Sequence, residues 1–361
     1  NCLTQTDKGN PTTRGYCWAA QITEVLRASG LQAAFDEFAR IYAEQADFKG
    51  LACHDATHVL GSEAYKAYAA NHTVIDRPET SFCGYGFYHG FIETMLLESG
   101  PGQFTEVTDY CRALKTKGVM NNAAGACYHG IGHAVFDTLP GTIWGDAYRM
   151  TRSALDACEL AVKDPAERSQ CGSGVFNSLA IAESRHLYNM TFDQTDPLGV
   201  CERQPDEYRK GCYGEMGIGT IREFQYDRSQ ALKFIAAIKN KKDASTVLEA
   251  YAGDEAVRTI ASPDLSDLRS LCASFPTEMA RRCDKGVLFG MRQAGIPGTE
   301  YANMFAYCKA LTDDARKACI DHTVIQARPL AKNPDDFMNT CVEAAGPEYA
   351  TRCKPSRQIT Q

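Results

Sequence analysis

Sixteen cysteines constrain the fold of this 361-residue chain more than any other feature. Their number is even, and they stand as isolated residues without the C-x-x-C pairs that zinc and iron–sulfur sites usually contain. This pattern is typical of a disulfide framework formed in an oxidising compartment. We therefore predict eight disulfides and an extracytoplasmic location, in the periplasm, at the cell surface or outside the cell.

The cysteines flank short polar stretches, and each second cysteine is followed by a small or apolar run with helical character. We interpret each stretch as the turn of an α-hairpin, with one cysteine near the end of the first helix and one near the start of the next. Pairing within each repeat is the preferred connectivity, although the sequence alone leaves other connectivities open. The predicted pairs are Cys2–Cys17, Cys53–Cys83, Cys111–Cys127, Cys158–Cys171, Cys201–Cys212, Cys272–Cys283, Cys308–Cys319 and Cys341–Cys353.

Helical repeats are the fold that this spacing favours. Repeats of roughly 33–47 residues accommodate two helices each, and each hairpin needs a neighbour to bury its apolar face. Alternating β-branched runs and Asn-Gly hairpin turns are missing. We predict an all-α fold, an α-solenoid or an irregular array of helical hairpins with about eight disulfides. The long step from Cys201 to Cys272 indicates one repeat that lacks its cysteine pair.

This array, over roughly Cys53 to Cys353, resembles Sel1-like and other tetratricopeptide-type helical repeats, especially secreted forms with one disulfide per repeat. The resemblance is architectural and implies a curved solenoid with a concave face, without a particular activity. We divide the chain into an N-terminal helical part, 1–145, the disulfide-closed repeats, 146–353, and a polar tail, 354–361.

Histidines cluster in the first half of the chain, in the segments CHDATH, CGYGFYHGFIE and CYHGIGH. Pairs spaced i, i+4 put two side chains on one face of a helix, which is how a helix offers two ligands to one metal. We predict that this cluster binds one or two transition-metal ions such as zinc, copper or iron. Asp137 is a further candidate as an outer partner. The predicted ligands are His54, His58, His89, Glu93, His129 and His133.

The repeat supports this prediction through one shared position, six residues after the helix-starting cysteine. That slot holds histidine in two early repeats, at His89 and His133, and apolar residues in most later ones, among them Ile218, Phe289 and Ile325. We expect the slot to face the core or a groove. A buried histidine there needs a partner, because an unpaired buried polar group costs about 1–3 kcal/mol.

A structural interpretation remains open beside the metal site. The histidines would then cap helices or form polar networks, and the glycines between them would serve close helix packing. The protein would be an interaction scaffold, or a structural subunit of an assembly or filament, that binds a protein partner or other subunits on the concave face. If the protein is an enzyme, an open metal position would activate water or oxygen, with Glu93 or Asp137 as base or supporting group.

Other classes of function are disfavoured. The net charge is −7 and no run of Lys or Arg occurs, so we predict no nucleic-acid partner. The sequence contains no stretch of eighteen apolar residues, so we predict no transmembrane segment. Nucleotide-binding and serine-hydrolase motifs do not occur in a convincing strand–helix context. The start at Asn1 leads us to expect that a leader has been removed.

Overall fold

The computed structural model describes residues 11–45, 51–71, 77–100, 104–116, 121–260, 264–296 and 298–354, together with residues 2, 48, 49 and 75. Every regular element in these ranges is a helix, and none of them contains a strand. The all-α prediction is therefore confirmed. Of the polar tail, residues 355–361 lie outside the described ranges.

The chain divides into two compact units, Asn1–Tyr251 and Ala252–Gln361, which we call unit 1 and unit 2. The division falls inside α11 (Lys241–Thr259). The boundary that we predicted near residue 145 stays a prediction.

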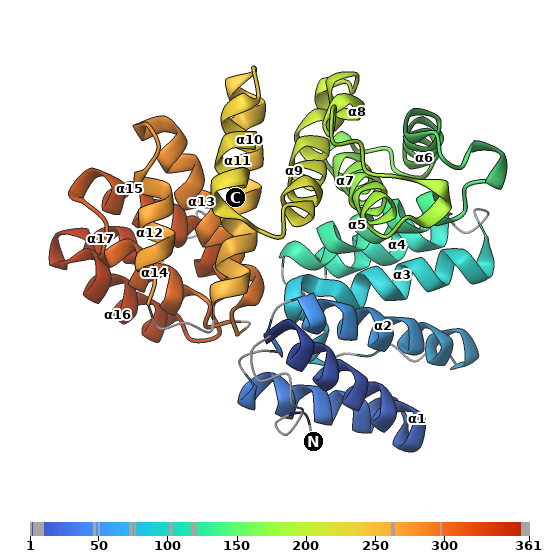
Figure 1. The fold of residues 1–361 in the computed structure, drawn as a ribbon. Coiled ribbons are helices and arrows are strands. Elements are labelled where there is room, and N and C mark those ends of the chain that lie inside the picture. Colours follow the sequence, from blue (N-terminus) through green and yellow to red (C-terminus); the bar gives the residue numbers. More distant parts are fainter. Residues whose placement is uncertain are drawn as a thin grey trace. The chain divides into compact units, whose positions relative to one another are not determined.

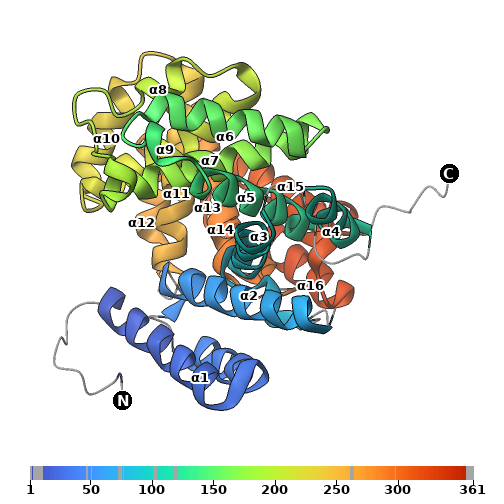
Figure 2. The same ribbon diagram turned by 90° about the vertical axis from the view of Figure 1, so that its right-hand side faces the viewer.

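Unit 1 contains a row of helices in which each packs on the next (Figure 1). Three further helices lie against this row, α4 on α5, α6 on α7 and α8 on α9 (Figure 2). The row consists of α1 (Pro11–Glu44), α2 (Leu51–Asn71), α3 (Gly86–Ser99), α5 (Asn121–Asp137), α7 (Pro165–Ser184) and α9 (Asp206–Glu223). The other elements of unit 1 are η2 (Pro78–Ser81), η3 (Cys83–Tyr85), α4 (Phe104–Thr116), η5 (Gly141–Ile143), α6 (Ala147–Ala161), η6 (Leu187–Asn189), α8 (Gly199–Glu202) and α10 (Arg228–Ala237).

Unit 2 continues the helical hairpins. In it, α13 packs on α12, α14 and α15, and α14 packs on α16. Its elements after α11 are α12 (Ser266–Ala273), α13 (Thr277–Ala294), α14 (Tyr301–Lys309), α15 (Asp313–Ala327), η7 (Arg328–Leu330), α16 (Pro334–Ala345), η8 (Pro347–Tyr349) and α17 (Ala350–Cys353).

All eight predicted disulfides are present, with Cα–Cα distances from 5.3 to 5.9 Å. The second cysteine of a pair is the seventh residue of its helix in α5, α7, α9, α13 and α15. Each of these five disulfides therefore joins the second turn of one helix to the helix before it. The predicted arrangement does not hold for Cys53–Cys83, because Cys53 lies in the first turn of α2 and Cys83 lies in η3. The pair of helices α10 and α11 contains no cysteine, as the long step between Cys201 and Cys272 predicted.

Local sequence explains where the helices begin. Asp164 caps α7 by accepting hydrogen bonds from the backbone N–H groups of residues 166 and 167, and Pro165 occupies the first helical position. Asn333 and Pro334 act in the same way at α16. A short polar side chain at the cap followed by proline is a strong signal for a helix start.

The shared repeat slot is not equally buried along the chain, and in unit 2 it does not face the core. Phe289 instead lines a small hollow together with Met304 and His322. His89, His133 and Ile218 are 6%, 7% and 8% exposed, whereas Phe289 and Ile325 are 46% and 68% exposed. The slot fixes a position on its own helix. Its burial depends on whether another helix covers that face, which the repeat pattern does not specify.

Candidate metal centre

Five imidazoles lie together in unit 1, on three helices that neighbour one another in the row. His54 and His58 come from α2, His89 from α3, and His129 and His133 from α5. The ring centroids of neighbouring imidazoles are 4.8 to 6.1 Å apart. The histidines that the sequence placed in three separate segments therefore form one cluster, with the ring of His89 at its centre.

Glycines allow the helices to approach this closely. A Cβ atom on Gly90 of α3 would lie 2.1 Å from the carbonyl oxygen of His58, and one on Gly61 of α2 would lie 2.0 Å from that of Phe87. At the next interface, a Cβ atom on Gly130 would lie 3.1 Å from the Cα of His89. Backbone therefore packs on backbone beside the histidines, and this packing brings their rings within reach of one another.

The nitrogens of His54, His58 and His89 have the spacing to hold one metal ion. One ring nitrogen from each lies within 4.8 Å of the other two. The Nε2 atoms of His54 and His58 are 3.1 Å apart. Two nitrogens at a metal–nitrogen distance of about 2.0–2.1 Å are separated by about 2.9 Å at a right angle and about 3.4 Å at a tetrahedral angle. The observed separation falls between these two values.

The first imidazole is oriented by a backbone carbonyl. The Nδ1 atom of His54 lies 2.7 Å from the carbonyl oxygen of Cys83, so Nδ1 donates its proton there and Nε2 carries the free lone pair. Cys83 is itself bonded to Cys53, one residue before His54. A hydrogen bond from the second ring nitrogen is the usual way in which proteins orient a metal-binding histidine.

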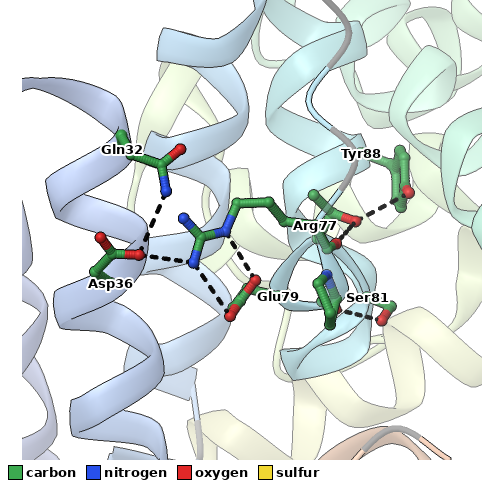
Figure 3. A network of polar contacts seen from close by, with 8 residues as sticks. Gln32, Asp36, Arg77, Glu79, Ser81 and Tyr88 are labelled. Carbon is green, nitrogen blue, oxygen red and sulfur yellow. Dashed lines mark hydrogen bonds and ion pairs between the residues drawn. The ribbon is translucent and has the colours of Figure 1, made fainter.

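The segment before Cys83 is held by polar contacts to α1 on one side and to α3 on the other (Figure 3). Arg77 binds Asp36 of α1 at 2.8 Å, and the hydroxyl groups of Thr80 and Tyr88 lie 3.2 Å apart. These contacts hold the carbonyl in front of the imidazole.

Two carboxyl groups lie near the Nδ1 side of His58. Glu93 Oε2 of α3 lies 3.7 Å from His58 Nδ1, and the Glu93 carboxyl is hydrogen-bonded to that of Asp137 at the end of α5. Burial, followed by the charge of Glu93, raises the pKa of Asp137 to about 7. The hydroxyl of Tyr188 donates to Asp137 Oδ1 at 2.9 Å. The structure thus places both predicted carboxylates beside the cluster, with Asp137 one step further out.

The two histidines of α5 have different surroundings. His133 Nδ1 lies 2.7 Å from the Ser178 hydroxyl of α7, which leaves its Nε2 free. His129 stacks on His89 with an interplanar angle of 26°. The Nδ1 atom of His89 is buried and has no hydrogen-bond partner among the described residues. The side chain is only 6% exposed, so this nitrogen needs a partner that the described residues do not supply.

Burial keeps four of these imidazoles neutral. Desolvation, with the charge of His58 second, lowers the pKa of His54 to about 3, and desolvation with the charge of His129 second holds that of His89 well below its usual range. The pKa values of His129 and His133 are also lowered, chiefly by burial. Neutral imidazole is the form that binds metals, so these four side chains are in the form that coordinates an ion at neutral pH.

Three partners of the site lie in positions that no motif indicated. They are the Cys83 carbonyl, Ser178 and Tyr188. Ser178 directly follows Asn177, the residue of its repeat in the shared slot, so the repeat frame could have pointed to it. The sequence marked Cys83 as a disulfide cysteine but not its carbonyl as a partner of His54, and nothing in the sequence marks Tyr188.

No protein-family model matches the chain, and no curated protein or solved structure matches it either. Among the described residues, no helix has the length and apolar character that crossing a bilayer requires. The assignment of function therefore depends on the geometry of the cluster.

Proposed function

We propose that this protein is an extracytoplasmic helical-repeat protein that binds a transition-metal ion, zinc, copper or iron, through His54, His58 and His89. The observation that carries the proposal is the convergence of three ring nitrogens within 4.8 Å of one another. The disulfides support the location, because such bonds persist in oxidising compartments. The row of stacked helices in unit 1 supports the resemblance to tetratricopeptide-type repeats.

The proton positions favour an ion over a hydrogen bond between the first two histidines. Without an ion, His54 Nδ1 keeps its proton for the Cys83 carbonyl, so a bond between the two Nε2 atoms must take its proton from His58. His58 Nδ1 would then present a lone pair to the Glu93 carboxyl oxygen at 3.7 Å. With an ion on both Nε2 atoms, His58 Nδ1 keeps its proton and faces the carboxylate as a donor.

The remaining two histidines extend the donor set. The rings of His129 and His133 lie 4.8 and 5.7 Å from that of His89, and the ring of His133 also lies 6.1 Å from that of His58. They would complete the coordination or hold a second ion, and the metal stoichiometry distinguishes these arrangements. An ion held here with an open position would act as a Lewis acid or would activate bound water.

The test is elemental analysis of protein purified without chelators, together with the variants His89→Ala and His322→Ala. His322 lies in α15 of unit 2 and serves as the matched control. We expect about one or two equivalents of one metal in the wild type and in His322→Ala, and loss of metal in His89→Ala. A wild type that carries no metal, and takes up none from added Zn²⁺, would contradict the proposal.

Protein binding is the second candidate function. Phe289, Ile296 and Ile325 of unit 2 are 46%, 49% and 68% exposed, and exposed large apolar side chains are common where partners dock. Ile325→Asp should weaken association with a partner or with a second copy, as measured by sedimentation, without affecting the metal content.

A further inference from the structure

Left-handed backbone at residues other than glycine is confined to three segments of unit 1 within the described chain. Such residues cost about 1–3 kcal/mol each and persist only where surrounding contacts hold them, often at functional sites. They are Cys83, Tyr85, His186, Tyr188, Asn189, Gln225 and Tyr226. The first segment supplies the carbonyl that orients His54. The second segment also reaches toward the cluster, through Tyr188.

Tyr188 is held in this conformation by the end of α5 and the segment that follows it. Its φ angle is +52°, and it lies in η6 after α7. Its ring packs on Phe136 and Trp144, with centroid distances of 6.0 and 5.2 Å. Its hydroxyl donates to Asp137 Oδ1 at 2.9 Å. The strained segment therefore delivers one hydroxyl group to one carboxyl group.

From that carboxyl a chain of polar contacts leads to the candidate ligands. Asp137 is hydrogen-bonded to Glu93, and Glu93 Oε2 lies 3.7 Å from His58 Nδ1. His58 Nε2 in turn lies 3.1 Å from His54 Nε2. A hydrogen bond from Tyr188 to Asp137 Oδ1 limits the orientations of that carboxyl and thereby those of Glu93.

We propose that Tyr188 is a positioning residue of the metal centre, which orients the His58 ring through Asp137 and Glu93. This inference rests on the proposed metal-binding function. It assigns to the strained segment after α7 the same task that the strained segment around Cys83 performs for His54. Each segment would orient one imidazole of α2 from its Nδ1 side.

The test measures Zn²⁺ dissociation constants of the wild-type protein, Tyr188→Phe and Glu93→Gln. We expect about a 10- to 100-fold weakening for Glu93→Gln, as is usual for groups that support a ligand, and about a 3- to 10-fold weakening for Tyr188→Phe, which acts one residue further out. Asp137→Asn interrupts the same chain and is a second variant. Co²⁺ absorption spectra should change in all three variants, because the geometry at His58 changes.

The matched control is Tyr301→Phe. Tyr301 of unit 2 donates to Asp336 at 2.6 Å, so this change removes the same kind of hydrogen bond away from the cluster. We expect its Zn²⁺ affinity and Co²⁺ spectrum to equal those of the wild type. Equal weakening in both tyrosine variants would assign the effect to general destabilisation and overturn the proposal.

The double variant Tyr188→Phe/Glu93→Gln tests the route. If Tyr188 acts through Glu93, the double variant binds Zn²⁺ as weakly as Glu93→Gln alone, whereas independent effects would multiply. The positioning role would be overturned if the losses of Zn²⁺ affinity multiplied in the double variant, or if Tyr188→Phe kept the affinity and spectrum of the wild type. The proposed function would still stand in either case, provided that His89→Ala loses the ion. A wild type that binds no ion would remove both.

Discussion

His133 Nδ1 and the Ser178 hydroxyl, on adjacent helices α5 and α7, lie 2.7 Å apart. Both side chains are buried, at 7% and 6% exposure. The contact occupies the nitrogen of His133 that would otherwise lack a partner, and it joins the histidine cluster to the next helix of the row. Its loss should therefore affect both stability and the cluster.

Ser178→Ala should lower the free energy of unfolding of the metal-free protein by about 1–3 kcal/mol, because it leaves a buried imidazole nitrogen unsatisfied. The control is Ser99→Ala, since Ser99 is exposed at the end of α3 and its hydroxyl bonds to that of Tyr65. That change should cost less than about 0.5 kcal/mol. Urea unfolding with a chelator present measures both, and equal stabilities would contradict the role of Ser178.

The close approach of α5 and α7 depends on Gly132. A Cβ atom there would lie 2.0 Å from the carbonyl oxygen of Cys171, which is backbone and cannot turn aside. Gly132→Ala should therefore separate the two helices and destabilise the protein by about 3 kcal/mol. Gly214 in α9 has open space around its Cβ position, so Gly214→Ala should stabilise by about 0.5–1 kcal/mol. The melting temperature should fall in Gly132→Ala and rise in Gly214→Ala, relative to the wild type. A lower melting temperature in both variants would count against close packing as the cause.

Glu183, in the last turn of α7, predicts a dependence on pH. Burial, with the charges of Asp193 and Glu223, raises the pKa of this carboxyl to about 7 from an ordinary value of 4.5. The folded state therefore binds the proton more tightly than the unfolded state does. The stabilising contribution of this proton is complete below pH 4.5 and is lost as the pH rises through 7.

Glu183→Gln should accordingly match the wild type at pH 4 and exceed its free energy of unfolding by about 2–3 kcal/mol at pH 8. Measuring both proteins by urea unfolding at each pH cancels the contributions of the other titrating groups. Glu223→Gln, which changes an exposed partner of the same carboxyl, should show a much smaller difference. A constant offset between wild type and Glu183→Gln at all pH values would show that the carboxyl does not titrate as described.

The regular spacing of the cysteine pairs allowed the fold to be predicted, because most of these cysteines lie close to helix ends. Where a polar turn is followed by a cysteine in the second turn of a helix, a disulfide to the preceding helix makes an α-hairpin the most economical fold. The histidine cluster was predictable for a related reason, since the i, i+4 spacing and the shared slot are properties of helices. The structural interpretation assigned five glycines to close helix packing, and the structure places Gly86, Gly90, Gly130 and Gly132 at close contacts. The fifth, Gly84, instead has a left-handed φ of +69°.

Contacts that depend on which helix covers which face were not predictable. Phe289 and Ile325 occupy the slot of His89 and His133 and yet are exposed, because the repeat determines the position on a helix and leaves the covering helix undetermined. Tyr188 reaches Asp137 through an irregular segment with left-handed residues. Neither periodicity nor motif spacing encodes such a path.

Because all sixteen cysteines are bonded to one another, the chain has no thiolate to offer to a metal. Thiophilic ions that select sulfur anions, such as copper(I), gain no advantage here over ions that accept imidazole nitrogen and carboxylate oxygen. The affinity of a nitrogen and oxygen site for divalent ions rises from manganese to copper(II) and falls again at zinc, so the ion that it holds would depend on this order together with the supply in its surroundings. The bonds that keep the helices in place would thus also shape the metal chemistry of the protein.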